Sequence, residues 1–194
     1  MHKNLELKDQ TAVVIREMTT DDLDRSLAFF DSLSAADRAY LRRDVTKREV
    51  VERRIAECGS GAAKRLVAIV DGRIVADGTL ELSGEDWKQH VGELRLIVAG
   101  PHRRQGLGAL IARELYRLAI GAKVEEIVVK MMRPQVAAQS IFKRLGFREE
   151  AVLPDYVKDL EGKRHDLIVM RCDIDALWSE MEDFLSTGDW QRTR

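Results

Sequence analysis

The sequence contains little cysteine, only Cys58 and Cys172 among its 194 residues. The spacing of these two residues fits no metal-binding pattern, and two cysteines cannot form a framework of several disulfides. Neither His90 nor His102 has a second ligand at metal-binding spacing. We therefore expect no metal site, and a reducing, cytoplasmic compartment is the simplest assumption.

An excess of either charge is also absent, because 32 Lys and Arg residues stand against 33 Asp and Glu residues, giving a formal net charge of -1. Proteins that hold nucleic acid by bulk positive charge are strongly basic. The net charge therefore disfavours one alternative, nucleic-acid binding through Arg42, Arg43, Arg103 and Arg104. We therefore expect any basic residue that binds a ligand to do so at a particular site and not through the overall charge of the protein.

Long apolar runs, a secretion signal, internal repeats and linkers are missing too. A membrane-spanning helix needs about 18 or more apolar residues in succession, and no stretch comes near that length. With 45% hydrophobic residues, the chain is long enough for one well-buried domain and short for two. We expect a loose polar arm at residues 1–10, one domain at 11–186 and a tail at 187–194.

Strand and helix patterns alternate along the chain. Short apolar or alternating runs predict strands at residues 11–16, 65–70, 73–82, 93–98, 126–131, 147–157 and 164–174. Asp71-Gly72 predicts a hairpin between the second and third of these strands. Apolar stripes and caps predict helices around 23–30, at 35–42, from a capping box at 46–49 to about 58, from 107, after Pro134, and around 177–185. A whole helix separates strands 93–98 and 126–131, so these two strands should be parallel. The last helix would pack on the body or, alternatively, form a homodimer contact.

The most informative stretch is residues 92–115, GELRLIVAGPHRRQGLGALIAREL. Its strand pattern runs into a turn containing Gly106 and Gly108, which is followed by an amphipathic helix. Glycines let the backbone turn tightly and let a bulky anion approach main-chain N–H groups, while a helix N-terminus favours negative charge. The pattern therefore predicts a diphosphate-binding turn.

Two other nucleotide-binding motifs are excluded at this turn. No Gly-Lys-Ser/Thr is present, and Ile111 stands where the third glycine of Gly-x-Gly-x-x-Gly belongs. What remains is Arg103-x-x-Gly106-x-Gly108, which resembles the acetyl-CoA motif of the GCN5-related N-acetyltransferases (GNAT). Residues 139–147, QSIFKRLGF, resemble that family's helix that ends at Gly-Phe and leads into a strand.

The resemblance implies an α/β (α+β) fold with a mixed, mostly antiparallel central sheet, a parallel central strand pair and helices on both faces. It also implies acetyl-CoA as acyl donor, no metal, and an amine acceptor on a small molecule or a protein lysine, nearest to bacterial protein-lysine or small-amine acetyltransferases. The implied cofactor contacts are Leu96, Ile97, Val98, Arg103, Arg104, Gln105, Gly106, Leu107, Gly108, Ala109, Gln135 and Phe142.

Glu93 is the candidate general base, since a glutamate at this place of the strand has that role in similar family members. The alternative is that Glu93 is an ordinary polar residue at a strand end. Backbone N–H groups around Val98 would meet the thioester carbonyl, because strands of the family separate there.

The sequence departs from the family pattern at the expected leaving-group acid. Many members carry a tyrosine where this chain has Phe142, so Tyr156 or His165 would have to substitute, or the thiolate would leave to solvent. Gln135 stands where asparagine is common. Lys130 weakens the resemblance to acetyltransferases of ribosomal-protein N-termini. These departures keep open a second hypothesis, a CoA-binding sensor or interaction domain with little or no transferase activity.

Overall fold

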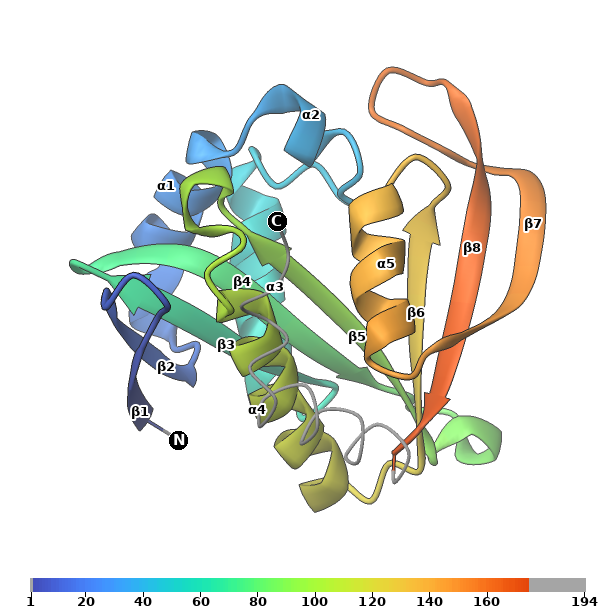
Figure 1. Cartoon of the computed structure of the whole chain (residues 1–194), viewed down its shortest axis with the longest axis horizontal. Coiled ribbons are helices and arrows are strands. Elements are labelled where there is room, and N and C mark those ends of the chain that lie inside the picture. Colours follow the sequence, from blue (N-terminus) through green and yellow to red (C-terminus); the bar gives the residue numbers. More distant parts are fainter. Residues whose placement is uncertain (1, 175–194) are drawn as a thin grey trace.

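The computed structural model describes residues 2–174, apart from the side chains of residues 58 and 59. Its centre is one sheet of eight strands, in the order β1-β2-β3-β4-β5-β6-β8-β7 (Figure 1). The strands are β1 His2–Glu6, β2 Ala12–Glu17, β3 Ala63–Val70, β4 Arg73–Leu82, β5 Val91–Val98, β6 Glu126–Met132, β7 Arg148–Lys158 and β8 Arg164–Asp173. The helices are α1 Leu23–Ser32, α2 Ala35–Arg38, α3 Arg48–Gly59, α4 Leu107–Gly121 and α5 Val136–Arg144, with short 3-10 turns η1 Thr20–Asp22, η2 Asp86–Lys88 and η3 Gly100–His102.

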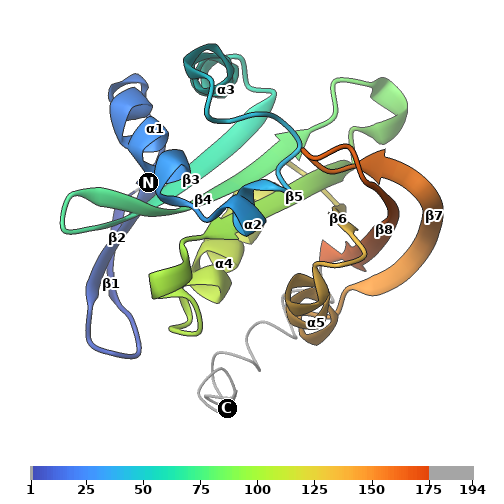
Figure 2. The same ribbon diagram turned by 90° about the horizontal axis from the view of Figure 1, so that it is seen from above.

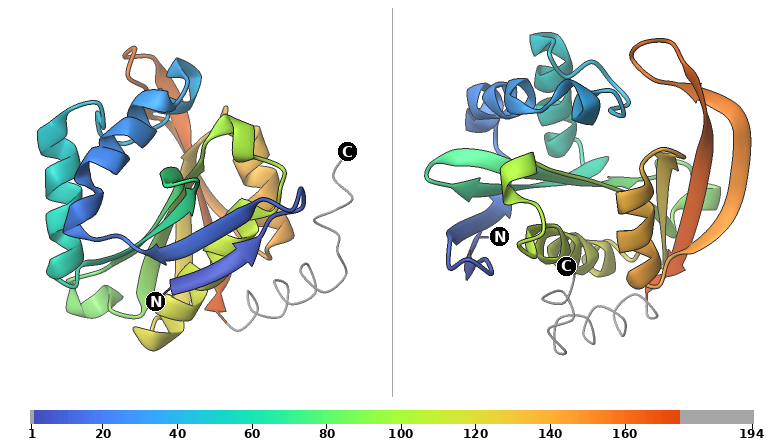
Figure 3. Two further views of the ribbon diagram at one scale, coloured as in Figure 1. Left: turned by 90° about the vertical axis from the view of Figure 1, so that its left-hand side faces the viewer. Right: turned by 45° about the horizontal axis from the view of Figure 1, so that its top comes forward.

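The expected fold class is confirmed. Every strand pair in the described sheet is antiparallel except β5 and β6, which are parallel because α4 carries the chain back across one face. Helices α1 and α3 lie on one face of the sheet and α4 on the other, as the edge-on views show (Figures 2 and 3).

The two faces of the sheet carry separate cores. Under α4, buried residues such as Leu80, Leu94 and Ile111 form the larger core, and under α1 and α3 a smaller one contains Phe29, Phe30 and others. Gly78 lets α4 approach β4, since a Cβ at this position would lie 2.5 Å from Ile111 Cγ2. The alternating residues of β5 divide between these faces, which decides where its polar side chains point.

The N-terminus differs from the expected loose arm. Residues 2–6 form β1, which pairs with β2 along its whole length, from His2 opposite Arg16 to Glu6 opposite Ala12. Lys3 Nζ lies 2.6 Å from Oε2 of the buried Glu114 on α4, and Leu7 is buried in the core. The sequence prediction was wrong here because these contacts are made with residues far along the chain.

Two helix starts or ends also differ from the sequence prediction. Helix α2 ends at Arg38 rather than at residue 42, and Arg38 turns back to donate to the carbonyl oxygens of Leu33 and Asp31 at 2.8 and 3.0 Å. Helix α3 has no side-chain cap, because the Thr46 hydroxyl instead donates to Asp44 Oδ1 at 2.6 Å. The helix predicted around 177–185 lies outside the described residues.

Strands β5 and β6 stay together for only three residue pairs. Pairing runs from Val91 opposite Glu126 to Glu93 opposite Val128, yet β5 continues to Val98 and β6 to Met132. The two strands diverge into a V beyond this point (Figure 1). Glu93 therefore stands where the parallel pair opens. Within residues 2–174, no helix has the length and apolarity to cross a membrane.

Candidate active site

The turn before α4 has the conformation that the glycine pattern predicted. Gly106 precedes the helix with φ 84°, a left-handed conformation that favours glycine. The first helical hydrogen bond runs from Leu110 N–H to Gly106 O at 3.1 Å, so the amides of Leu107, Gly108 and Ala109 precede the hydrogen-bonded part of the helix. Amides at a helix N-terminus can bind an anion such as a diphosphate, and we call this turn the anion site.

The residues around this turn differ in how they could contact a bound cofactor. Leu107 is buried at 1% exposure, so it could meet a cofactor only through its backbone. A Cβ on Gly108 would lie at ordinary contact distance, 3.6 Å, from Leu96 Cδ2. Arg104 has a left-handed φ of 62°. The Gln105 carbonyl oxygen accepts from the Lys8 N–H at 3.4 Å, which links the β1–β2 turn to the anion site.

Arg103 is held by the protein itself. Its Nε donates to Val98 O at 2.8 Å, and its Nη2 lies 2.6 Å from Asp37 Oδ1 on α2. The guanidinium thus fastens the end of β5 to α2, while 44% of the Arg103 side chain remains exposed.

The N–H of Val98 faces the opening between β5 and β6. Ala99 donates its N–H to Val75 O on β4 at 2.9 Å, and neighbouring residues of a strand direct their N–H groups to opposite edges. The Val98 carbonyl, which points the same way as its N–H, is bonded to Arg103 and not to β4. This arrangement is the one needed for a backbone donor to a thioester carbonyl.

Glu93 lies in a cluster of charged side chains on the α1 and α3 side of the sheet. Its Oε2 lies 2.8 Å from Lys130 Nζ, Arg42 Nη1 is ion-paired with Oε1, and Arg95 Nε lies 3.8 Å from Oε1. Only 17% of the Glu93 side chain is exposed. Burial raises its pKa, but the Lys130 hydrogen bond and the Arg42 charge outweigh burial and hold that pKa below the usual value.

The remaining predicted side chains lie on α5 and at the β7–β8 end. Gln135 Oε1 accepts from the Met132 N–H at 2.8 Å, closing the turn between β6 and α5. Phe142 packs edge-on against Phe147, with ring centroids 5.1 Å apart. Tyr156 is exposed, whereas His165 Nε2 lies 2.7 Å from Asp159 Oδ2 in the β7–β8 hairpin. None of these interactions brings a proton donor to the anion site.

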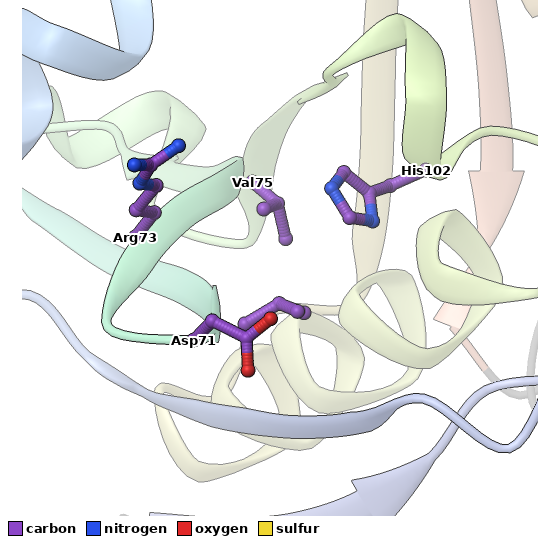
Figure 4. A pocket seen from close by; sticks show the side chains of 5 residues that line it. Asp71, Arg73, Val75 and His102 are labelled. Carbon is purple, nitrogen blue, oxygen red and sulfur yellow. The ribbon is translucent and has the colours of Figure 1, made fainter.

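A pocket of about 400 Å³ lies at the tip of the β3–β4 hairpin, lined by Val70, Asp71, Arg73, Val75 and His102 (Figure 4). His102 and Val75 point toward each other across it, and Arg73 extends away. Its lining includes no member of the Glu93 cluster, so we assign it no part in the chemistry. Among the described residues, no group of three or more His, Cys, Asp and Glu side chains is arranged to hold a metal ion.

Comparisons with known proteins agree with this geometry. A sequence profile of the Acetyltransferase (GNAT) family matches residues 27–147. The chain belongs to the GNAT acetyltransferase family and is an acetyl-CoA-dependent N-acetyltransferase. No protein with a curated description matches the sequence significantly.

Several solved structures share the fold. Mycobacterium smegmatis RimJ in complex with CoA-disulfide is 16% identical with a TM-score of 0.78, covering 96% of this chain and 94% of that one. Ribosomal-protein-alanine N-acetyltransferase from Brucella melitensis is 23% identical with a TM-score of 0.71, covering 82% and 98%. A putative acetyltransferase from Salmonella typhimurium, solved with its cofactor acetyl-CoA, is 17% identical with a TM-score of 0.72, covering 84% and 94%.

Sequence reasoning placed none of Arg42, Glu81 and Arg95 beside Glu93. Arg95 could have been found, since it lies two residues after Glu93 on a strand and so shares its face. Arg42 carried no such signal, because it reaches Glu93 from the loop after α2.

Proposed function

We propose that this enzyme transfers the acetyl group to a primary amine by direct attack within a ternary complex, with Glu93 as the carboxylate that serves the amine. The observation that carries the proposal is the position of Glu93, the last β5 residue paired with β6 before the strands separate. The anion site at the start of α4 and the Val98 N–H lie further along the same strand and turn. Acetyl-CoA can thus reach the opening from one side of the sheet and the amine acceptor from the other.

The steps follow from these positions. The arriving ammonium group first passes one proton through Glu93 to solvent. The neutral amine then attacks the thioester carbon, whose carbonyl oxygen accepts a hydrogen bond from the Val98 N–H, to form a tetrahedral intermediate. The carbon–sulfur bond then breaks, CoA leaves as a thiolate that takes a proton from solvent, and the amine loses its proton toward Glu93. Because its pKa is lowered, Glu93 is ionised at neutral pH and attracts an arriving ammonium group.

A second candidate function is a CoA-binding sensor with weak transferase activity. Two observations favour it: Phe142 has no proton to give, and Glu93 is already paired with Arg42 and Lys130. Release of CoA in the presence of amines separates the two candidates.

Glu93→Gln tests the proposed role, because glutamine keeps the shape and removes the charge. We expect the transfer rate to fall about 10²- to 10⁴-fold, the usual scale for a positioned base, with acetyl-CoA affinity nearly unchanged. Glu126→Gln is the matched control, since Glu126 is a strand carboxylate paired with Arg171 at 2.9 Å outside the cluster. If Glu93→Gln stays within about twofold of the parent between about pH 6 and 9, the base lies elsewhere.

A further inference from the structure

The cluster around Glu93 holds more positive than negative charge. Its members are Arg42, Arg95, Lys130, Glu81 and Glu93, which amount to three cations and two carboxylates. Glu81 stands opposite Glu93 in the β4–β5 register and is ion-paired with Arg95, so the two carboxylates are both engaged. One unit of positive charge is left uncompensated in the cluster.

The next charges on this face do not remove the excess. Arg54 and Asp77 form a pair at 3.0 Å that is neutral as a unit. Beyond them, Glu57 is shared between Arg65 at 2.6 Å and Arg43 at 3.3 Å, which adds a further cation. The charged groups next to the cluster therefore add positive rather than negative charge.

Arg95 has a hydrogen-bond donor that the cluster does not satisfy. Its Nε atom is buried without a hydrogen-bond partner and lies 3.8 Å from Glu93 Oε1, too far for a hydrogen bond. Burial, and after it the charge of Arg42, lowers the pKa of Arg95, which means that two like charges oppose each other there. A carboxylate placed among Arg42, Arg95 and Lys130 would accept the unused donor and relieve that repulsion.

An acceptor that carries only an amine would make the imbalance worse. Its ammonium form would add a fourth cation next to three, whereas an amine that also bears a carboxylate adds no net charge. In this structure Arg42 forms an ion pair with Glu93, at the place where an ammonium group would bind. When the ammonium takes that place, Arg42 is released to pair with the acceptor's own carboxylate, while Lys130 stays beside Glu93.

We propose that the acceptor is an amine with a carboxylate close to it, an amino-acid-like molecule, and that Arg42, Arg95 and Lys130 select it by binding that carboxylate. The inference rests on the proposed amine transfer at Glu93. It commits to a carboxylate because the acceptor carries one negative charge once its amine has lost the proton, and this charge matches the excess of one. Polyamines and lysine-rich peptides are then poor acceptors.

The test compares ω-amino acids that have one to four carbons between amine and carboxylate with the corresponding amides, such as β-alanine with β-alaninamide. CoA release measures turnover, and calorimetric titration of the N-acetylated acid and N-acetylated amide into CoA-loaded protein measures binding without chemistry. We expect the carboxylate member of at least one pair to be favoured about 10- to 100-fold in both measurements. The amine of each amide is less basic than the amine of the corresponding acid, so a larger fraction of it is neutral and able to attack. A faster reaction of the acid therefore cannot come from amine basicity.

Lys130→Met identifies the residues responsible. This variant should lower the ratio of acid to amide about tenfold or more and leave acetyl-CoA affinity unchanged, a split that a merely structural role would not produce. Arg171→Met, which removes a cation from β8 outside the cluster, should leave the ratio unchanged.

The outcomes separate this inference from the proposed function. Equal turnover of acids and amides would keep amine transfer and overturn the carboxylate preference. Failure of the acetylated acids to bind would overturn that preference as well. Selective binding of the acetylated acids without any turnover would support the preference and defeat the transfer mechanism.

Discussion

At the scale of single residues, Glu93 shows how a strand position acquires chemistry from its neighbours. Its carboxylate is ionised and held by two cations, which suits attraction of an ammonium group better than strong basicity. Two other residue-scale predictions concern side chains away from the opening between β5 and β6.

Asp22 is a buried carboxylate whose charge stabilises the fold. Arg16 holds both of its oxygens at 2.6 Å, and the Thr19 N–H donates to Oδ2 at 2.9 Å. Burial alone would raise its pKa, but these partners lower it to about 2 from 3.8. Since the folded pKa lies below the unfolded one, the stabilisation is complete above about pH 4 and is lost as the pH falls toward 2, and it amounts to about 2 kcal/mol.

Asp22→Asn should therefore lower the free energy of unfolding by about 2 kcal/mol at neutral pH, measured by urea titration. The difference from the parent should shrink as the pH falls below about 4. Asp21→Asn, an exposed neighbour, is the control. Parallel stability curves for the parent and Asp22→Asn down to about pH 3 would contradict this account of Asp22.

The two cysteines should be dispensable for turnover, because direct attack by the amine needs no acyl-enzyme. Replacing the buried Cys172 by alanine removes packed atoms and should cost about 1 kcal/mol of stability. We expect the double variant Cys58→Ala, Cys172→Ala to keep its catalytic rate within about tenfold of the parent. A larger loss in a folded protein would point to a covalent intermediate.

At the scale of elements, the turn before α4 is the feature that the fewest neighbouring residues were needed to predict. Gly106 supplies the left-handed turn, and Gly108 lies in the first turn of the helix, where neighbours leave room for a Cβ. A carboxylate there should suit the helix dipole and oppose a bound diphosphate.

Gly108→Asp should thus fold as well as the parent and bind acetyl-CoA at least about tenfold more weakly, as measured by calorimetry. Gly108→Ala is the control for size and should bind within a few-fold of the parent, because its Cβ would lie 3.6 Å from Leu96 Cδ2. If Gly108→Asp binds acetyl-CoA as tightly as the parent does, the diphosphate does not bind at this turn.

At the scale of the whole molecule, α4 lies on one face of the sheet and α1 and α3 lie on the opposite face (Figure 2). The proposed donor and acceptor sites therefore face the opening between β5 and β6 from the two sides. A ligand that binds only the folded state stabilises the entire domain. Acetyl-CoA at a hundredfold excess over Kd should add about 2.7 kcal/mol, and the melting temperature should rise by about 5 to 10 °C. An unchanged melting temperature would contradict cofactor binding by the native protein.

Local sequence patterns predicted much of this fold. The β3–β4 hairpin follows from Asp71-Gly72 between two apolar runs, and α4 follows from its apolar stripe and the glycine turn, because each depends on residues only a few positions apart. The same patterns place Glu93 on a strand leading to the anion site. They do not reveal its ion partners.

Only the tertiary structure decided the rest. Strand β1 forms because β2 offers it an edge and Glu114 offers Lys3 a charge, more than a hundred residues away in the chain. Arg42, Glu93 and Lys130 come together only once β5 and β6 are in register and the loop after α2 has crossed above them. Sequence periodicity records contacts within an element, whereas these ion pairs depend on the paths of three separate segments, and so the charge that we expect to select the acceptor was set by the fold.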